Sequence, residues 1–335
     1  MVSNAQRTFK LSTGAQIPAI GLGTWQDESA QEAAVLVALQ AGYRHIDTAR
    51  CYGTEVAVGK AIKQSGIPRS EIFVTSKLWN NKHHPDDVGP ALQASLDDLG
   101  MEYLDLFLMH WPVAFRRGDD PFPSDKEGNL ITEDIDYLDV SPVLNQRQDC
   151  LLTDQKTYKA MEGLVKSGKA KAIGVSNFSQ QEIERILTNA TIKPAVHQME
   201  MHPWLQQKDF FEFHRMHGIH VTQYSPFGNQ NEIYGSREEH GQLVNDETLV
   251  EIGKKYGKTS NQVALAWGIA HGRSVIPKSK SPERITQNFD IAFKLEPEDI
   301  EKINSIDKKI RFNDSSKDFG YELFTGLDGK QSERH

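Results

Sequence analysis

Short apolar runs rich in β-branched residues alternate with amphipathic stretches along most of this chain. The segment "TFKLSTGAQIPAIGLGTW" alternates around a Gly turn, which predicts a β-hairpin near the N-terminus. Its last run, IGLGTW, and a helix expected at 29–41 form the first strand–helix unit. The other units pair GYRHID with a helix at 54–65, EIFVTSK with 86–99, YLDLFLMH with 154–167, AKAIGVSN with 179–189, AVHQME with 206–217, HVTQYS with 246–256 and 260–271, and SVIPKS with 282–289. Eight such units predict an α/β fold, a (β/α)8 TIM barrel of parallel strands covered by helices, in a single domain over residues 1–335.

Three segments do not fit the repeat. Residues 112–153 form a long loop after the fourth strand, and residues 226–244 form another after the seventh. Loops of this length in a compact domain usually serve as lids or binding loops. The tail from about residue 307 carries aromatic residues without a helical period: Phe312, Phe319, Tyr321 and Phe324. Two interpretations stay open for it, a C-terminal loop over the active-site face of the barrel or a tail that lies along the surface.

Composition narrows the class of protein. With 335 residues, of which 38% are hydrophobic, the chain can bury a large core. A net charge of −8 argues against general binding of nucleic acid or anionic membranes. No apolar run approaches the roughly 18 residues that span a bilayer, and the N-terminus lacks an apolar signal region. Cys51 and Cys150 are the only cysteines and lack metal-ligand spacing, so we expect a cytoplasmic protein without metal or disulfides. The sequence shows no coiled-coil heptad pattern or obvious interface segment, so a monomer is the default expectation.

Ionisable residues end three successive predicted strands. Asp47 ends the second strand, Lys77 the third and His110 the fourth, while Tyr52 follows Asp47 in the same loop. A lone Asp or Lys at such a position is more often a solvated loop residue. A lone His is more often a core or surface residue whose hydrogen bonds are already satisfied. The carboxyl ends of barrel strands all meet at the catalytic face, however, so we expect these side chains to lie together.

The types of these residues indicate proton transfer to an oxygen. A tyrosine has an unperturbed pKa of about 10, so it needs help to exchange a proton near neutral pH. The ammonium of Lys77 would favour the phenolate of Tyr52 and lower that pKa, and Asp47 would keep Lys77 charged and in place. His110 could donate or accept a hydrogen bond at the reacting oxygen. A general acid at a carbonyl oxygen suggests reduction, which requires a hydride donor.

The stretch "VIPKSKSPERITQN" could anchor such a donor, because no strand-linked G-x-G-x-x-G motif is present. Ser281 has the properties of an N-cap and Pro282 of a first helical residue, so the helix start presents free backbone amides to an anion. Lys278 and Arg284 flank this start. The pair suits a phosphate monoester such as the 2′-phosphate of NADP. A capped surface helix with incidental basic residues is the alternative.

The motifs together resemble the aldo-keto reductase superfamily over nearly the whole chain. "GLGTW", "DTARCYGTE", "VTSKLW", "LMHWP", "GVSNF", "YSP" and "IPKS" occur in order and at plausible spacing. The long loop after the fourth strand is similar to that of fungal members of the NADP-dependent glycerol dehydrogenase and aldehyde reductase type. Two positions depart from the family pattern: His197 stands beside Gln198 where asparagine is common, and Thr54 stands where asparagine is frequent.

The resemblance implies roles for particular residues. The implied catalytic tetrad is Asp47, Tyr52, Lys77 and His110, with Tyr52 as the proton donor. Contacts to NADPH or NADP+ are implied for Thr24, Trp25, Asp47, Ser176, Asn177, Gln198, Tyr224, Ser225, Lys278, Ser279, Arg284, Gln287 and Asn288. The implied substrate pocket is formed by Trp25, Trp79, His110 and Trp111. Aromatic walls of this kind suit a small carbonyl substrate of apolar or modestly polar character.

The activity that follows is NADPH-dependent reduction of aldehydes or ketones to alcohols, reversible towards oxidation of a polyol such as glycerol. A rival from another class stays open, namely a barrel that holds the nucleotide with little turnover, like the channel-subunit or structural relatives of this superfamily. A purely structural role would not require the four candidate catalytic residues.

Overall fold

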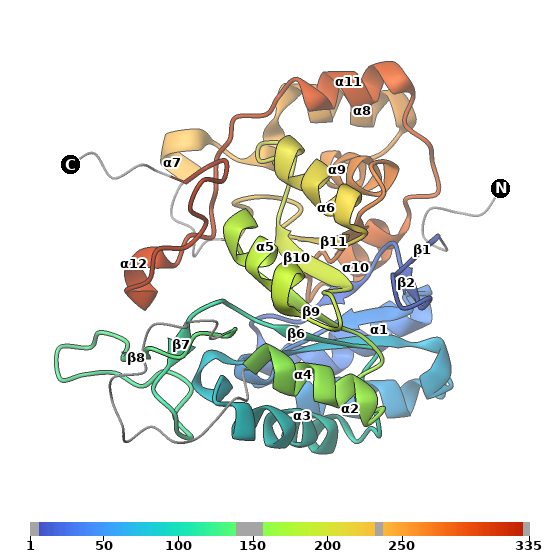
Figure 1. The fold of residues 1–335 in the computed structure, drawn as a ribbon. Helices are drawn as coiled ribbons and strands as arrows, with labels where there is room; N and C mark the ends of the chain where they lie inside the picture. Colours follow the sequence, from blue (N-terminus) through green and yellow to red (C-terminus); the bar gives the residue numbers. More distant parts are fainter. Residues whose placement is uncertain (1–6, 139–156, 232–236, 331–335) are drawn as a thin grey trace, which may run out of the picture.

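The structure is a computed structural model, and it describes residues 7–138, 157–231 and 237–330. Residues 139–156, which contain Cys150 and the expected start of a helix at 154, lie outside the described residues. The predicted hairpin is present, because β1 (Thr8–Lys10) pairs antiparallel with β2 (Gln16–Pro18). This hairpin precedes the main sheet in the sequence and lies on the side of the molecule that carries the N-terminus (Figure 1).

The main sheet has eight strands that pair in parallel, in the order β12-β11-β10-β9-β6-β5-β4-β3. These are β3 (Leu22–Gly23), β4 (His45–Asp47), β5 (Phe73–Leu78), β6 (Leu106–Met109), β9 (Ile173–Ser176), β10 (Val196–Glu200), β11 (His220–Tyr224) and β12 (Ser274–Val275). Parallel bridges from Ile20 to Val275 and from Gly23 to Lys278 join the two edge strands. The sheet thus closes on itself, and the predicted barrel is confirmed.

Helices follow the strands and cover the outside of the barrel (Figure 1). They are α1 (Gln31–Ala41), α2 (Glu55–Ser65), α3 (Pro85–Leu99), α4 (Thr157–Lys166), α5 (Gln180–Asn189), α6 (Lys208–His217), α8 (Glu247–Tyr256), α9 (Ser260–Ala270) and α10 (Pro282–Phe289). Local sequence explains several boundaries. Capping boxes begin α5 at Ser179 and α9 at Thr259, and Gly42 ends α1 with a left-handed φ of 112°.

Five further elements, two short strands and three helices, were not predicted. The loop after β6 contains a small antiparallel pair, β7 (Ala114–Phe115) and β8 (Thr132–Glu133), and the loop after β11 contains α7 (Arg237–His240). Beyond the barrel come α11 (Pro297–Asn304) and α12 (Ser316–Phe319). These elements are too short, or too polar, to show a clear hydrophobic period in the sequence.

The C-terminal tail packs over the mouth of the barrel, which decides between the two interpretations of this segment. Phe319 and Phe324 pack against Trp111, with ring centres 5.1 and 6.2 Å apart respectively. Buried Glu200, at the end of β10, accepts backbone N–H bonds from Phe312 (2.9 Å) and Asn313 (2.8 Å). These contacts fix the start of the tail to a barrel strand and its later aromatic residues to the cavity wall.

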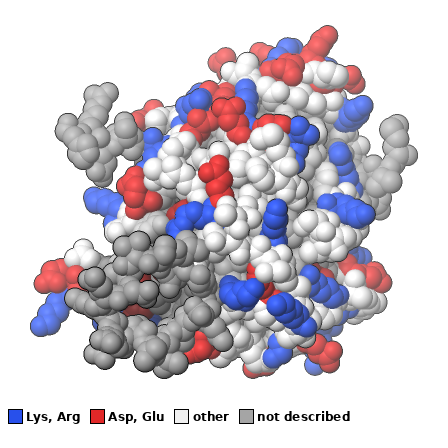
Figure 2. All heavy atoms as spheres, viewed as in Figure 1, with Lys and Arg blue, Asp and Glu red and all other residues white. Residues whose placement is uncertain are grey.

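Two general features of the described residues bear on the predicted class. No helix among them is both long and apolar enough to cross a bilayer. Acidic and basic side chains are scattered together over the face seen in Figure 2, without a large region of one sign.

Candidate active site

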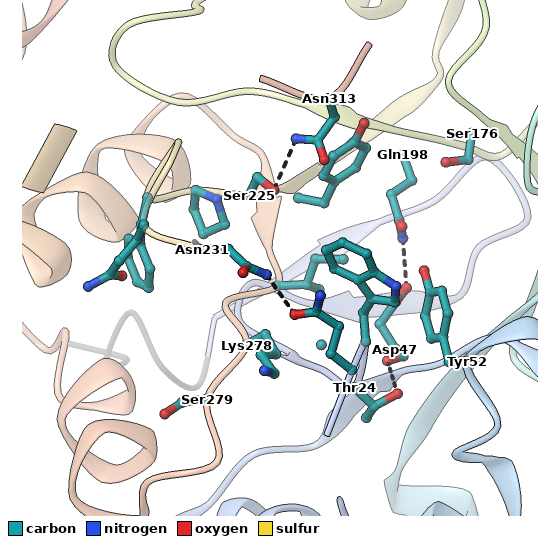
Figure 3. A pocket seen from close by; sticks show the side chains of 18 of the residues that line it. Thr24, Asp47, Tyr52, Ser176, Gln198, Ser225, Asn231, Lys278, Ser279 and Asn313 are labelled. Atoms are coloured by element: carbon teal, nitrogen blue, oxygen red, sulfur yellow. Dashed lines mark hydrogen bonds between the residues drawn. The ribbon is translucent and has the colours of Figure 1, made fainter. Parts of the chain in front are cut away.

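The carboxyl ends of the strands open into a cavity of about 840 Å³. Its lining comes from strand ends such as Asp47 and Tyr224, from the loop after β6 and from the C-terminal tail. Figure 3 shows Asp47 and Tyr52 at one end of this cavity and Lys278 and Ser279 towards the other. The predicted residues are therefore distributed between two ends of one cavity, which differ in chemistry.

At the first end, Asp47 and Lys77 form a buried ion pair. Lys77 Nζ lies 2.6 Å from Asp47 Oδ1, and both side chains are almost completely buried. Lys77 Nζ also donates to the carbonyl of Thr48 at 2.9 Å. Asp47 ends β4 and Lys77 lies on the adjacent strand β5, so the parallel register of two neighbouring strands sets their separation. A buried charge pair with these additional hydrogen bonds has a fixed geometry.

Tyr52 and His110 lie beside this pair. Lys77 Nζ is 5.0 Å from the centre of the Tyr52 ring, and the Tyr52 hydroxyl lies 3.3 Å from His110 Nε2. Tyr52 is held by a short 3-10 helix, Arg50–Tyr52, that ends at Gly53 with a left-handed φ of 70°. His110 follows β6 directly. The structure thus brings all four residues that the sequence predicted as catalytic into one group.

His110 is neutral at physiological pH. Burial and the positive charge of Lys77 hold its pKa well below the usual value for histidine. Its second ring nitrogen, Nδ1, lies 3.6 Å from Cys51 Sγ. Burial raises the pKa of the Cys51 thiol, so the sulfur keeps its proton. A neutral thiol can donate to Nδ1 or accept from it, so the contact permits either tautomer of the imidazole.

A network of amides and hydroxyls extends from this group along the cavity. Gln198 Nε2 donates to Asp47 Oδ2 at 2.6 Å, as drawn in Figure 3. Asn177 donates to the carbonyl of His110 at 3.1 Å and accepts from the Tyr224 hydroxyl at 2.7 Å. Thr24 Oγ1 donates to the carbonyl of Asp47 at 3.1 Å. The predicted cofactor residues of this region, including Ser176 and Ser225, line the same cavity.

His197, the departure from the family pattern next to Gln198, does not line the cavity. Its Nε2 accepts a hydrogen bond from the Phe178 amide at 3.2 Å, and its Nδ1 lies 2.7 Å from His214 Nε2. Burial holds the pKa of both imidazoles below the usual value, so both are neutral. Because side chains alternate along a strand, Gln198 faces the site and His197 faces α6.

The walls of this end are aromatic. Trp79, Trp111 and Trp25 line the cavity as predicted, and Trp25 is 37% exposed. Two further aromatic residues lie there without having been assigned to the pocket, Phe122 from the loop after β6 and Phe319 from the tail. Trp79 donates its Nε1–H to the carbonyl of Pro121 at 2.6 Å, which fixes the loop beside it. The group of aromatic residues in the tail was the available signal for Phe319, whereas Phe122 is the only aromatic residue in a polar stretch and gave no such signal.

The second end of the cavity is cationic. Lys278, Ser279, Arg284 and Asn288 line it, close to the N-terminus of α10. Ser281 caps this helix, because its hydroxyl accepts from the Arg284 amide at 3.3 Å. The predicted capped helix start is present. Gln287 is exposed on α10 and is not among the residues that line the cavity, so its predicted contact stays a prediction.

Two residues of this cationic end were missed in the sequence. Lys280 also lines the cavity, and Asp27 bonds to both Lys278 and Lys280. Asp27 lies in the loop after β3, some 250 residues from its partners, and only barrel closure brings them together. A single charged residue in a loop gives no signal of such a contact.

A (β/α)8 barrel with a buried Asp–Lys pair, a tyrosine and a neutral histidine at its catalytic face defines a class of barrel oxidoreductases. The chain belongs to the aldo/keto reductase family, whose model matches residues 19–308. It is an enzyme that oxidises or reduces carbonyl and alcohol groups of small molecules with a nicotinamide cofactor, as is general for this family.

Individual relatives are similar to this chain over most of their own length. An uncharacterised oxidoreductase of Schizosaccharomyces pombe is 48% identical over 97% of this chain and 96% of its own. Aldo-keto reductase family 1 member A1 of Homo sapiens is 41% identical over 90% of each chain. The solved structure of aldose reductase from Schistosoma japonicum is similar with a TM-score of 0.83 and 32% identity, covering 98% of this chain and 100% of that one. The family and fold predictions are confirmed.

Proposed function

We propose that the protein reduces aldehydes and ketones to alcohols with NADPH, and that the reaction reverses to oxidise a polyol such as glycerol. The observation that carries this proposal is the group formed by Tyr52, His110 and the buried Asp47–Lys77 pair at the floor of the cavity. The similarity to a protein described as an aldose reductase supports an aldehyde as the substrate class.

The residues along the cavity fit a phosphorylated dinucleotide. The four residues Asp47, Tyr52, Lys77 and His110 are called the proton-transfer group below. One cavity joins this group to the cationic end, and its volume of about 840 Å³ lies within the range of cofactor sites. Ser176, Asn177 and Gln198 would hold the carboxamide of the nicotinamide, and Tyr224 would stack on its ring. Lys278 and Arg284 would hold the 2′-phosphate near the amides that begin α10, where an anion is favoured. When bound, the nicotinamide supplies the hydride that reduces the carbonyl carbon.

The protein's own residues supply the proton and the geometry. Tyr52 donates its hydroxyl proton to the carbonyl oxygen as reduction occurs. The ammonium of Lys77, 5.0 Å from the ring centre, stabilises the phenolate that remains. Asp47 keeps that ammonium charged within a buried site. Neutral His110, next to the Tyr52 hydroxyl, orients the carbonyl oxygen by hydrogen bonding.

The aromatic walls exclude water and select the substrate. Trp79, Trp111, Phe122 and Phe319 surround the space above Tyr52 and offer apolar contact area. Removal of water from this space strengthens the interaction between the Lys77 ammonium and the developing phenolate. Small carbonyl compounds with an apolar or modestly polar body fit these walls.

The rival function, a barrel that binds the nucleotide with little turnover, predicts a different result in one assay. Purified protein is mixed with NADPH and glyceraldehyde, and the absorbance of the reduced nucleotide is followed. We expect the absorbance to fall with aldehyde present and to stay constant without it. Tight binding of NADPH, with no fall over a panel of aldehydes and ketones, would establish the rival function instead.

A further inference from the structure

At the cationic end of the cavity, two of the lysines already have an anionic partner within the protein. Asp27 Oδ1 lies 2.7 Å from Lys280 Nζ, and Asp27 Oδ2 bonds to Lys278 Nζ. Asp27 belongs to the loop after β3, and both lysines follow β12. These two strands are neighbours at the point where the barrel closes, since Gly23 bridges to Lys278. The contact is therefore built into the closure of the barrel.

Asp27 is the only carboxylate that lines this end of the cavity in the described part of the chain. Asp47, the other carboxylate of the lining, is committed to Lys77 and Gln198 at the opposite end. Hydrogen bonds from Lys278 and Lys280 lower the pKa of Asp27 to about 2, so it is ionised at neutral pH. Three cationic side chains and one anionic side chain thus face the same space, since Arg284 lines it too.

We propose that the negative charge of Asp27, paired with Lys278 and Lys280, opposes binding of the 2′-phosphate of the cofactor, and so determines how strongly the protein discriminates NADPH from NADH. This inference rests on the proposed function, because it takes NADPH as the ligand. A phosphate monoester carries a charge of about −1.5 to −2 and accepts hydrogen bonds from the same ammonium groups as the Asp27 carboxylate. Asp27 engages one donor of each lysine and adds a negative charge beside the incoming phosphate.

The negative charges of Asp27 and the 2′-phosphate decide whether Asp27 strengthens or weakens NADPH binding. An ammonium has three donors, so each lysine can contact Asp27 and a phosphate together, and Asp27 need not be displaced. Repulsion between the carboxylate and the phosphate remains in that arrangement. The pairs are partly exposed, with 28% of the Asp27 side chain accessible, so water and salt weaken this repulsion. We expect Asp27 to weaken NADPH binding by about three- to tenfold.

The test is the substitution Asp27→Asn. Asp27 has a left-handed φ of 54°, and asparagine is the residue after glycine that tolerates this region best, so the loop should keep its shape. Dissociation constants for NADPH and NADH are measured by quenching of tryptophan fluorescence, since Trp25 lines the cavity. We expect NADPH to bind about three- to tenfold more tightly and NADH to change less than about twofold. The gain for NADPH should shrink at high ionic strength.

Asp290→Asn is the matched control. It removes the same charge from a carboxylate that is also paired to a lysine, Lys258 at 2.5 Å, but Asp290 does not line the cavity. We expect neither nucleotide to respond to this change. A response equal to that of Asp27→Asn would mean that net charge alone is responsible, and would contradict the proposal.

Other outcomes also decide the matter. Weaker NADPH binding by Asp27→Asn would show that Asp27 positions the lysines for the phosphate instead of opposing it, and would overturn the inference. Equal gains for NADPH and NADH would place its effect away from the 2′-phosphate, with the same consequence. Failure of the unchanged protein to bind NADPH would refute the proposed function, whereas NADPH binding that Asp27→Asn leaves unaltered would refute the inference alone.

Discussion

The charged side chains at the two ends of the cavity differ in their exposure to solvent. At the floor, Asp47 and Lys77 are 3% and 0% exposed and lie on adjacent strands. At the cationic end, Lys278 and Lys280 are 28% and 55% exposed and lie in a loop. Both ends contain an aspartate paired with lysine, yet only the first pair is shielded from water.

Under the proposed function, this difference in accessibility suits two different roles. A desolvated pair interacts strongly and has one geometry. Proton transfer requires such a geometry, because donor and acceptor must be placed to within about a few tenths of an ångström. A partly exposed pair is weakened by water and salt and can exchange partners, which suits a ligand that must bind and leave. Substitutions at the floor should therefore have large effects, and substitutions at the cationic end should have smaller ones that depend on salt.

The largest expected effect is that of Tyr52→Phe. The change removes the hydroxyl that lies 3.3 Å from His110 Nε2 but keeps the ring. Loss of a general acid typically costs about 10²- to 10⁴-fold in rate, so we expect turnover of glyceraldehyde to fall by that factor. Affinity for NADPH, measured by fluorescence, should stay within about threefold, because one uncharged hydroxyl is worth little in binding. Unchanged turnover would remove Tyr52 from its proposed role.

Lys77→Met should damage both stability and activity. It leaves the Asp47 carboxylate buried without its cation, and breaking a buried pair in this way typically costs about 3–5 kcal/mol. Urea unfolding should show this loss. The double variant Asp47→Asn/Lys77→Met removes both charges, so it should recover part of the stability while remaining inactive. Equal stability of the single and double variants would show that the pair is not desolvated in solution.

The floor of the cavity could be predicted from the sequence because strand geometry determines it. Asp47, Lys77 and His110 end successive predicted strands, and parallel strands in a barrel bring their carboxyl ends to one face. Ser281 and Pro282 likewise show the start of α10 through local capping chemistry. In both cases the sequence signal is local and the fold supplies the rest.

The loops and the tail could be predicted only in part. The closeness of Asp27 to Lys280 depends on barrel closure, and the position of Phe319 depends on how Glu200 holds the start of the tail. Neither contact has a sequence period, since the partners are far apart and lie in irregular segments. His197 is the converse case. It stands beside Gln198 in the sequence, but strand alternation turns it away from the site.

At the cationic end, Arg284→Ala should weaken NADPH by about tenfold and NADH much less, because only NADPH carries the 2′-phosphate. Arg284 is exposed, so a larger loss is not expected. Lys258→Ala is the control, since it removes one positive charge outside the cavity. Equal losses for both nucleotides would count against the contact with the 2′-phosphate. A loss as large as that of Tyr52→Phe would contradict the contrast between the two ends.

The smallest effect is expected for Cys51→Ser, although Cys51 lies next to the proposed proton-transfer group of Asp47, Tyr52, Lys77 and His110. Its thiol is protonated, because burial raises its pKa, so it contributes no thiolate that could act on the substrate. Its contact with His110 Nδ1 is 3.6 Å long, and a serine hydroxyl can also donate to or accept from that nitrogen. Turnover should therefore change by less than about threefold, the range of one weak hydrogen bond. A collapse of the rate, with unfolding by urea unaltered, would show that the floor of the cavity depends on the sulfur and that its proton-transfer group has a fifth member.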